Sequence, residues 1–191
     1  MDNSATIRGV LAESYANLAM AHKAVADGDT KYGRVHFMIR ARLRKGLMTN
    51  TLSMKSLFDD ERLKLTRERA CTYCGATTKL SADHLIASSR GGADSGDNLV
   101  WACRSCNSSK GARDLLEWWF ATRDGFPPLM LLRRYLKLAW ALAYAEGVLD
   151  ESLDSADSLP IRFELIPLNF PKPSELVLWA DDTGARRPSD A

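Results

Sequence analysis

The sequence lacks an apolar run close to the roughly 18 residues that a membrane-spanning helix needs. No basic-then-apolar segment typical of a secretion signal follows Met1. We therefore expect a cytoplasmic protein, in a reducing compartment that disfavours disulfides. Internal repeats are also absent, but 46% of the 191 residues are apolar, which is enough for a core and excludes a disordered chain. This length suits one compact domain with appendages, or two small domains.

Cysteine is scarce, with only four residues, but all four fall into two Cys-x-x-Cys pairs, Cys71/Cys74 and Cys103/Cys106. Two cysteines separated by two residues can face a single ion, and two such pairs complete a tetrahedral thiolate shell for Zn²⁺. The alternative is two disulfides, which the expected reducing compartment disfavours. We therefore predict a structural zinc that ties the two pairs together and closes a compact hairpin.

The formal net charge is only +2, but the charges are unevenly distributed. Residues 31–70 carry 11 Lys/Arg against 4 Asp/Glu, whereas residues 146–191 carry 4 against 10. A basic arm that leads into the zinc hairpin favours a polyanionic partner, because each neutralised phosphate releases counterions. The alternatives are an ordinary solvated helix face and pairing of the basic arm with the acidic C-terminal segment.

Helical periodicity predicts most of the structure outside the hairpin. Helices are expected over residues 4–27, about 30–46, about 51–70 and 129–147. Gly28 and Gly46 are expected to end the first two helices. The last helix is the most apolar, and we interpret it as a core or dimer-packing helix. His22 and His36 lie on the first two helices without a partner motif, so we expect packed or surface histidines there.

Between the cysteine pairs the pattern changes to short segments broken by Gly, Ser, Asp and Asn. Strands are expected over residues 80–86 and 99–102, joined by a loop with Gly91-Gly92 at its turn. A helix is expected to start near Asn107 and to continue through Trp118, Trp119 and Phe120. These three aromatic rings could stack on bases, but we expect them to lie in the core.

The C-terminal part of the chain is acidic and punctuated by proline. Short strands are expected there at residues 161–166 and 175–179, and the last ten residues are expected to be disordered. The predicted organisation is therefore a helical basic region (1–70), a hairpin core (71–120), a packing helix (121–150), an acidic segment with short strands (151–180) and a disordered tail (181–191).

The hairpin contains the only Asp-His step of the chain. Its motif residues, in order, are Cys71-Thr-Tyr-Cys74, Asp83-His84, Gly91-Gly92, Asp97-Asn98-Leu99, Cys103-Arg-Ser-Cys106-Asn107 and Lys110-Gly111. This pattern resembles the HNH endonuclease family, in the branch that carries a zinc held by four cysteines. The likeness covers roughly residues 71–116 and includes the spacing, with 14 positions from His84 to Asn98 and 9 from Asn98 to Asn107. The resemblance implies an α+β fold: a small ββα-metal core embedded between N- and C-terminal helices, mostly α overall.

The resemblance also implies metal-dependent hydrolysis of phosphodiester bonds, with double-stranded DNA as the expected substrate. Hydrolysis needs an activated water, and neutralisation of the charge that builds up on the phosphate. An imidazole can accept a proton at pH 7, and the family implies this role of general base for His84. Asp83 and Asn107 offer the hard oxygen ligands that Mg²⁺ or Mn²⁺ prefers, and the family places them on the catalytic ion. For Asn98 the implied role is to brace the loop and orient His84.

Two details of this site follow from local chemistry. Adjacent strand residues point to opposite faces, so we expect a bend or a strand end where Asp83 and His84 meet one phosphate. Many family members have histidine at the position of Asn107. Asparagine is a weaker ligand, which favours Mg²⁺ or Mn²⁺ over a transition metal held by several imidazoles.

Lys110 and Arg113 are expected near the start of the helix that follows Asn107, whose positive end favours an anion. Together with Arg90 beside Gly91, they are expected to contact backbone phosphates, which positions a duplex without reading its sequence. For each of them an ordinary surface charge is the alternative.

The flanking helices match no family, and we expect them to supply DNA affinity or a homodimer interface. The family also implies a bacterial or phage protein, such as a restriction, packaging, homing or defence nuclease. The main alternative is a zinc-knuckle nucleic-acid-binding module without catalysis, and a further one is a zinc-stabilised protein-interaction domain. The non-catalytic zinc-knuckle module leaves the spacing of Asn98 and Asn107 unexplained.

Overall fold

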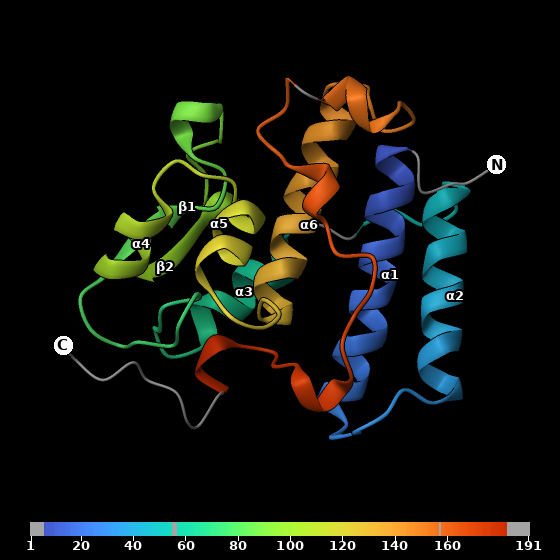
Figure 1. Cartoon of the computed structure of the whole chain (residues 1–191), viewed down its shortest axis with the longest axis horizontal. Coiled ribbons are helices and arrows are strands. Elements are labelled where there is room, and N and C mark those ends of the chain that lie inside the picture. The colour runs from blue at the N-terminus through green and yellow to red at the C-terminus, as the bar shows by residue number, and fades with distance from the viewer. Residues whose placement is uncertain (1–5, 55–56, 157, 183–191) are drawn as a thin grey trace.

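The structure is a computed structural model that describes residues 6–54, 57–156 and 158–182, apart from the side chain of Phe58. The described residues form a mostly helical fold with one small antiparallel sheet, which confirms the expected α+β class (Figure 1). The helices are α1 (Ile7–Ala26), α2 (Arg34–Met48), α3 (Phe58–Thr66), α4 (Arg104–Lys110), α5 (Leu115–Thr122) and α6 (Leu129–Ala145), and the strands are β1 (Leu80–His84) and β2 (Leu99–Cys103). Of these helices, none is both long and apolar enough to cross a membrane.

The N-terminal helices agree closely with the periodicity. The hydroxyl of Thr6 accepts a hydrogen bond from the backbone N–H of Gly9 at 3.1 Å, which caps the start of α1. α1 then packs between α2 and α6 (Figure 1). The prediction that Gly46 ends the second helix was wrong, because α2 continues to Met48. Gly46 instead allows a close approach, since a Cβ there would lie 2.4 Å from a methyl carbon of Leu52.

One hydrophobic cluster runs from α1 through α6 and into the hairpin. Trp118 is fully buried, and its ring meets that of Tyr73 edge to face with 5.0 Å between the centroids. Trp119 is 4% exposed, so both tryptophans belong to the core as expected, whereas Phe120 is 46% exposed. Six apolar residues of α6 are buried in the same cluster, so α6 is a core helix: Leu131, Leu132, Tyr135, Leu136, Ala139 and Ala143.

The helix expected from Asn107 through Phe120 is in fact two helices. α4 ends at Lys110, and Gly111 follows with a φ of +54° that a continuing helix cannot accept. Asp114 then caps α5, because its Oδ1 accepts hydrogen bonds from the N–H groups of Leu116 (2.8 Å) and Glu117 (3.2 Å).

The strands expected at residues 161–166 and 175–179 are absent from the described part of the chain. The acidic segment instead runs across the helices as extended chain with short 3₁₀ turns: η4 (Leu153–Ala156), η5 (Phe163–Leu165), η6 (Pro173–Glu175) and η7 (Ala180–Asp182) (Figure 1). It is held by side-chain and backbone hydrogen bonds rather than by a sheet edge. Asn17 donates to the Leu168 carbonyl at 2.9 Å, and Tyr32 to that of Pro171 at 2.7 Å. The backbone N–H groups of Leu129 and Met130 donate to the carbonyls of Val177 and Leu178, both at 3.0 Å. Residues 183–191 of the predicted tail lie outside the described residues, and 181–182 are part of η7.

Candidate functional site

The four cysteines meet at the open end of the hairpin. Cys71 and Cys74 precede β1, Cys103 ends β2, and Cys106 lies in the first turn of α4. Their Sγ atoms all lie within 4.8 Å of one another, and those of Cys74 and Cys103 are 3.8 Å apart. A tetrahedral shell with Zn–S bonds of about 2.3 Å has an edge of about 3.8 Å. All four cysteines are free of disulfides, so the donor set fits Zn²⁺.

A tight turn builds the first half of this cluster. The N–H of Gly75 donates to the Cys71 carbonyl at 2.8 Å, and the N–H of Cys71 donates to the Ala76 carbonyl at 2.7 Å. Gly75 has a φ of +77°, and a Cβ there would lie 2.9 Å from the carbonyl oxygen of Ala180. This position therefore needs glycine both for its backbone angle and for the close contact with the C-terminal segment.

The electrostatics of the cluster favour a bound cation. Hydrogen bonds from the thiols of Cys106 and Cys71 lower the pKa of Cys74, while contacts with Cys71 and Cys74 raise the pKa of Cys106. The thiolate of Cys74 is thus stabilised at the expense of that of Cys106, and four thiolates together need a metal ion.

Arg123 supplies a further positive charge to the thiolate cluster. Its guanidinium donates to Cys106 Sγ at 2.9 Å and lies 4.7 Å from the ring of Trp118. Sequence reasoning missed this residue, because it lies 17 positions after Cys106 in a segment without a motif.

A second group of side chains lies beside the zinc cluster. Asp83, His84 and Asn107 line one shallow cavity of about 200 Å³, together with small residues of the neighbouring loops (Ala87, Ser88, Ser89, Gly111 and Ala112). His84 is the last residue of β1, so the strand ends where the two adjacent side chains have to reach the same space. The three predicted residues are therefore brought together by the hairpin and α4.

Asp83 is 7% exposed and firmly held. Its Oδ2 accepts a hydrogen bond from the Tyr73 hydroxyl at 2.6 Å and lies 3.4 Å from Lys110 Nζ. Burial is the main cause that raises the pKa of Tyr73 well above its ordinary value, and the neighbouring Asp83 raises it further. The phenol therefore stays protonated and can donate. No partner within the described residues binds Oδ1 of Asp83, which leaves this oxygen for a ligand.

His84 and Asn107 also keep one functional atom unbound among the described residues. Nε2 of His84 lies 3.0 Å from Oδ1 of Asp94, and Nδ1 has no hydrogen-bond partner among the described residues. The amide nitrogen of Asn107 donates to the Ser81 hydroxyl at 3.2 Å, which leaves its Oδ1 as an acceptor. Asp94 was not foreseen, because it lies in the glycine-rich loop outside the motif residues.

Residues 71–113 match the family model described as HNH endonuclease. The chain carries an HNH domain. This segment contains the four cysteines, the Asp83-His84 step, Asn98 and Asn107, and it ends just before α5. Comparison of the chain with curated proteins and with solved structures gives no significant match. The helices α1, α2, α3 and α6 lie outside the matched segment.

Asn98 is the internal brace of the HNH domain, with 1% of its surface exposed. Its Oδ1 accepts from the Ile86 N–H at 2.9 Å, and its Nδ2 donates to the carbonyls of Ile86 at 2.8 Å and Ala93 at 2.9 Å. Gly92 lies against this brace, where a Cβ would be 1.8 Å from the Ile86 carbonyl oxygen. These are the contacts that the predicted bracing role of Asn98 requires.

The predicted phosphate contact by Lys110 is wrong. Lys110 is the last residue of α4 rather than near its start, and it is 1% exposed. Its ammonium donates to the His84 carbonyl at 2.6 Å and lies beside Asp83, so it faces the interior of the HNH domain. Burial lowers the pKa of Lys110, and the neighbouring Asp83 opposes this effect.

Arg90 and Arg113 are exposed, and each follows a cavity-lining residue in the sequence, Ser89 and Ala112 respectively. Arg90 ends the turn η2 (Ser88–Arg90). Arg113 also donates to the carbonyls of Ser109 and Lys110. α4 has only seven residues and begins at Arg104, so its positive end does not support Arg113 as expected.

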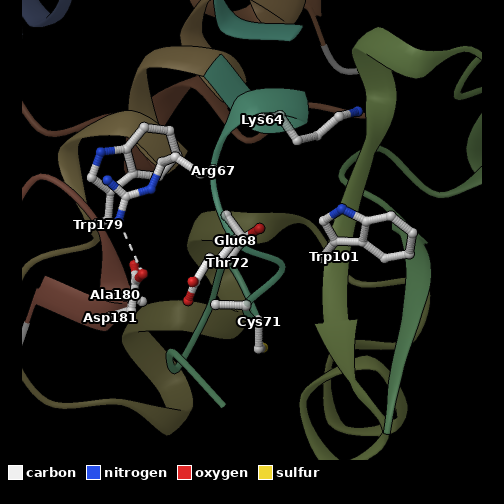
Figure 2. Close-up of a pocket in the computed structure, with 10 residues that line it drawn as sticks. Lys64, Arg67, Glu68, Cys71, Thr72, Trp101, Trp179, Ala180 and Asp181 are labelled. Atoms are coloured by element: carbon white, nitrogen blue, oxygen red, sulfur yellow. Dashed lines mark hydrogen bonds and ion pairs between the residues drawn. The ribbon is translucent and has the colours of Figure 1, made fainter. Parts of the chain in front are cut away.

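The basic arm is partly neutralised inside the molecule. Arg40 and Arg44 of α2 both bind Glu13 of α1. Arg67 reaches the acidic C-terminal segment, where its guanidinium lies 2.9 Å from Asp181 and 4.5 Å over the ring of Trp179 (Figure 2). The alternative considered above, pairing of the basic arm with the acidic segment, is therefore limited to Arg67 among the ion pairs of the described residues.

A second cluster of potential ligands is Asp27, Asp29 and His36. Nδ1 of His36 accepts a hydrogen bond from the Gly33 N–H at 2.9 Å, so neutral His36 carries its proton on Nε2. Nε2 lies 3.4 Å from Asp29 and has no lone pair for a metal in this state. His36 is thus a packed histidine, as expected.

Proposed function

We propose that the chain is a metal-dependent HNH endonuclease that hydrolyses phosphodiester bonds of DNA. The observation that carries the proposal is the shared cavity of Asp83, His84 and Asn107. Each of these side chains is held through one atom and leaves another atom free for the reaction. A module that only binds nucleic acid has no need for this arrangement.

The residues of the cavity fit a divalent ion with hard ligands. A carboxylate oxygen of Asp83 and the amide oxygen of Asn107 are the donor types that Mg²⁺ or Mn²⁺ prefers. When bound, such an ion neutralises charge on the scissile phosphate and on the leaving 3′ oxygen. Tyr73 and Lys110 fix the carboxylate of Asp83 for this purpose, because both hold its Oδ2.

His84 acts as the general base in this proposal. Nδ1 accepts the proton of the attacking water, and Asp94 holds the ring through Nε2 at 3.0 Å. The imidazole is exposed enough to meet substrate, with 28% of its side chain accessible. The zinc held by the four cysteines is structural, because its shell has no open position for a substrate.

Arg90 and Arg113, which follow the cavity-lining residues Ser89 and Ala112 in the sequence, are the proposed phosphate contacts. Each should release about one counterion when it binds a phosphate, so replacement by alanine should lower the slope of log affinity against log salt by about 1. Because they touch only the DNA backbone in this proposal, the loss of affinity should be similar for unrelated DNA sequences.

Nicking of supercoiled plasmid in Mg²⁺ and in Mn²⁺ tests the proposed activity. His84→Ala should lower the cleavage rate by about 10²–10⁴-fold, as expected for loss of a general base, with zinc content and melting temperature retained. His22→Gln is the matched control, because it removes a histidine of α1 that lies outside the cavity, and it should cleave like the native protein.

Equal cleavage by the native protein and His84→Ala would refute the catalytic assignment. Binding of DNA by the native protein, with no cleavage in either metal, would favour the non-catalytic zinc-knuckle module instead.

A further inference from the structure

We propose that Glu61 and Lys64 of α3 and Arg134 of α6 are positioning residues for the hydrolysis. They hold the turn η3 (Gly96–Asn98), which carries Asn98, and through Asn98 they set the position of His84. The inference rests on the proposed function, and it assigns a role to helices that lie outside the segment matched by the HNH family.

Two cations bind the backbone of this turn. Lys64 Nζ donates to the carbonyls of Gly96 and Leu99, both at 3.0 Å. Figure 2 shows Lys64 extending from α3 toward the hairpin. Arg134 donates from α6 to the carbonyls of Gly96 at 3.3 Å and Asp97 at 3.1 Å. Carbonyl groups on both sides of Asn98 are therefore fastened to helices outside the HNH domain.

Glu61 makes this double contact feasible. Its carboxylate binds Arg134 and lies 2.7 Å from Lys64 Nζ, so it compensates two cations that would otherwise repel each other. The side chain of Arg134 is only 6% exposed, which makes an uncompensated charge there costly. The turn lies directly on this carboxylate, because a Cβ on Gly96 would be 3.2 Å from Glu61 Oε2.

The neighbouring residue on α3 fixes the two helices to each other. Asp60 is buried and binds Lys137 of α6, and its Oδ1 lies 3.1 Å from Arg133 Nε. α3 and α6 therefore form a bracket on which η3 rests. Within the turn itself, the Asn98 N–H donates to the Ser95 carbonyl at 3.0 Å, and the Leu99 N–H donates to the Gly96 carbonyl.

The turn η3 is hydrogen-bonded directly to the two residues that follow His84 at the end of β1. The Asn98 carbonyl accepts from the Leu85 N–H at 2.8 Å, and the Asn98 side chain holds both polar backbone groups of Ile86. Leu85 is the residue next to His84. A shift of η3 would move the end of β1, and a misplacement of about 1 Å in a catalytic group can cost about 10²-fold in rate.

Steady-state cleavage of plasmid by Arg134→Met is the first test. We expect kcat to fall about 10–100-fold, with KM for DNA changed less than about 2-fold, because the contacts to substrate are untouched. Arg134→Lys keeps a donor for the turn and should recover most of the lost kcat. Arg8→Met is the matched control: it removes a similarly buried cation that binds Asp150 and makes no contact with α3 or η3 among those described, so its kcat should stay near that of the native protein.

Hydrogen exchange of the Ile86 amide gives a readout that does not depend on activity. Exchange should be faster in Arg134→Met than in Arg8→Met, because the hydrogen bond to Asn98 loosens only in the former. If native kcat and unchanged Ile86 exchange are found in Arg134→Met, the positioning role is refuted while the endonuclease proposal stands. If the native protein does not cleave DNA, the endonuclease proposal fails, and the exchange comparison still decides whether the bracket holds the turn.

Discussion

The replacement Asn98→Ala tests the central brace of the HNH domain. It removes the three side-chain hydrogen bonds to Ile86 and Ala93. The two bonds to Ile86 are buried, and an unsatisfied buried polar group costs about 1–3 kcal/mol. Ala93 is exposed, so water can replace its bond at little cost. We therefore expect a loss of about 2–5 kcal/mol, a large part of the roughly 5–15 kcal/mol that stabilises a typical domain.

Urea unfolding of the zinc-loaded protein measures this loss directly, with plasmid nicking in parallel. Asn107→Ala is the comparison, because its side chain is half-buried and makes one bond of 3.2 Å to Ser81. That variant should lose less than about 1 kcal/mol of stability but most of the cleavage, since a proposed ligand is removed. A loss below about 1 kcal/mol for Asn98→Ala would show that the brace does not stabilise the loop as reasoned.

Three further replacements probe other contacts. Tyr73→Phe removes the donor to Asp83 and should lower stability by about 1.5–3 kcal/mol in thermal unfolding; an unchanged melting temperature would contradict this. Arg123→Leu removes the donor to Cys106 and should speed zinc release to a chelator about 10–100-fold, whereas native kinetics would exclude its role. Burial alone would raise the pKa of Glu13, but its two arginine partners on α2 outweigh burial, and the net shift of the pKa is downward. The ion pairs therefore stabilise the fold fully at pH values above the ordinary glutamate pKa. This stabilisation is lost as the pH falls through the lowered pKa. Glu13→Gln should thus cost about 0.5–1 kcal/mol near pH 7, and the gap to the native protein should close in acid; a pH-independent gap would contradict this reasoning.

Local signals predicted much of this fold. The spacing of apolar residues located α1, α2 and α6 to within a few residues, because each buries a stripe against the core. The spacing of the cysteines predicted their convergence, since short loops leave few other arrangements. The Asp83-His84 step at the end of a strand also follows from local geometry.

The remaining features depend on contacts between distant segments. Lys110 looked like a surface cation, and only the tertiary structure shows its ammonium beside Asp83. The residues around Phe163 looked like a strand, but no sheet edge lies beside them in the described chain, so they form a short 3₁₀ turn. Asp94 and Arg134 lie outside any sequence motif. Their contacts, with His84 and with the Asp97 carbonyl, are hydrogen bonds that only the tertiary structure reveals.

The shared hydrophobic cluster limits how far the HNH domain could be shortened or transplanted. A fragment that stopped at Arg113 would lose Trp118, and the ring of Tyr73 would then face water. It would also lose Arg123 and with it the cation beside Cys106. A portable version of the HNH domain would therefore have to extend at least through α5, and a graft into another scaffold would have to rebuild the support that α3 and α6 give to the Asn98 turn.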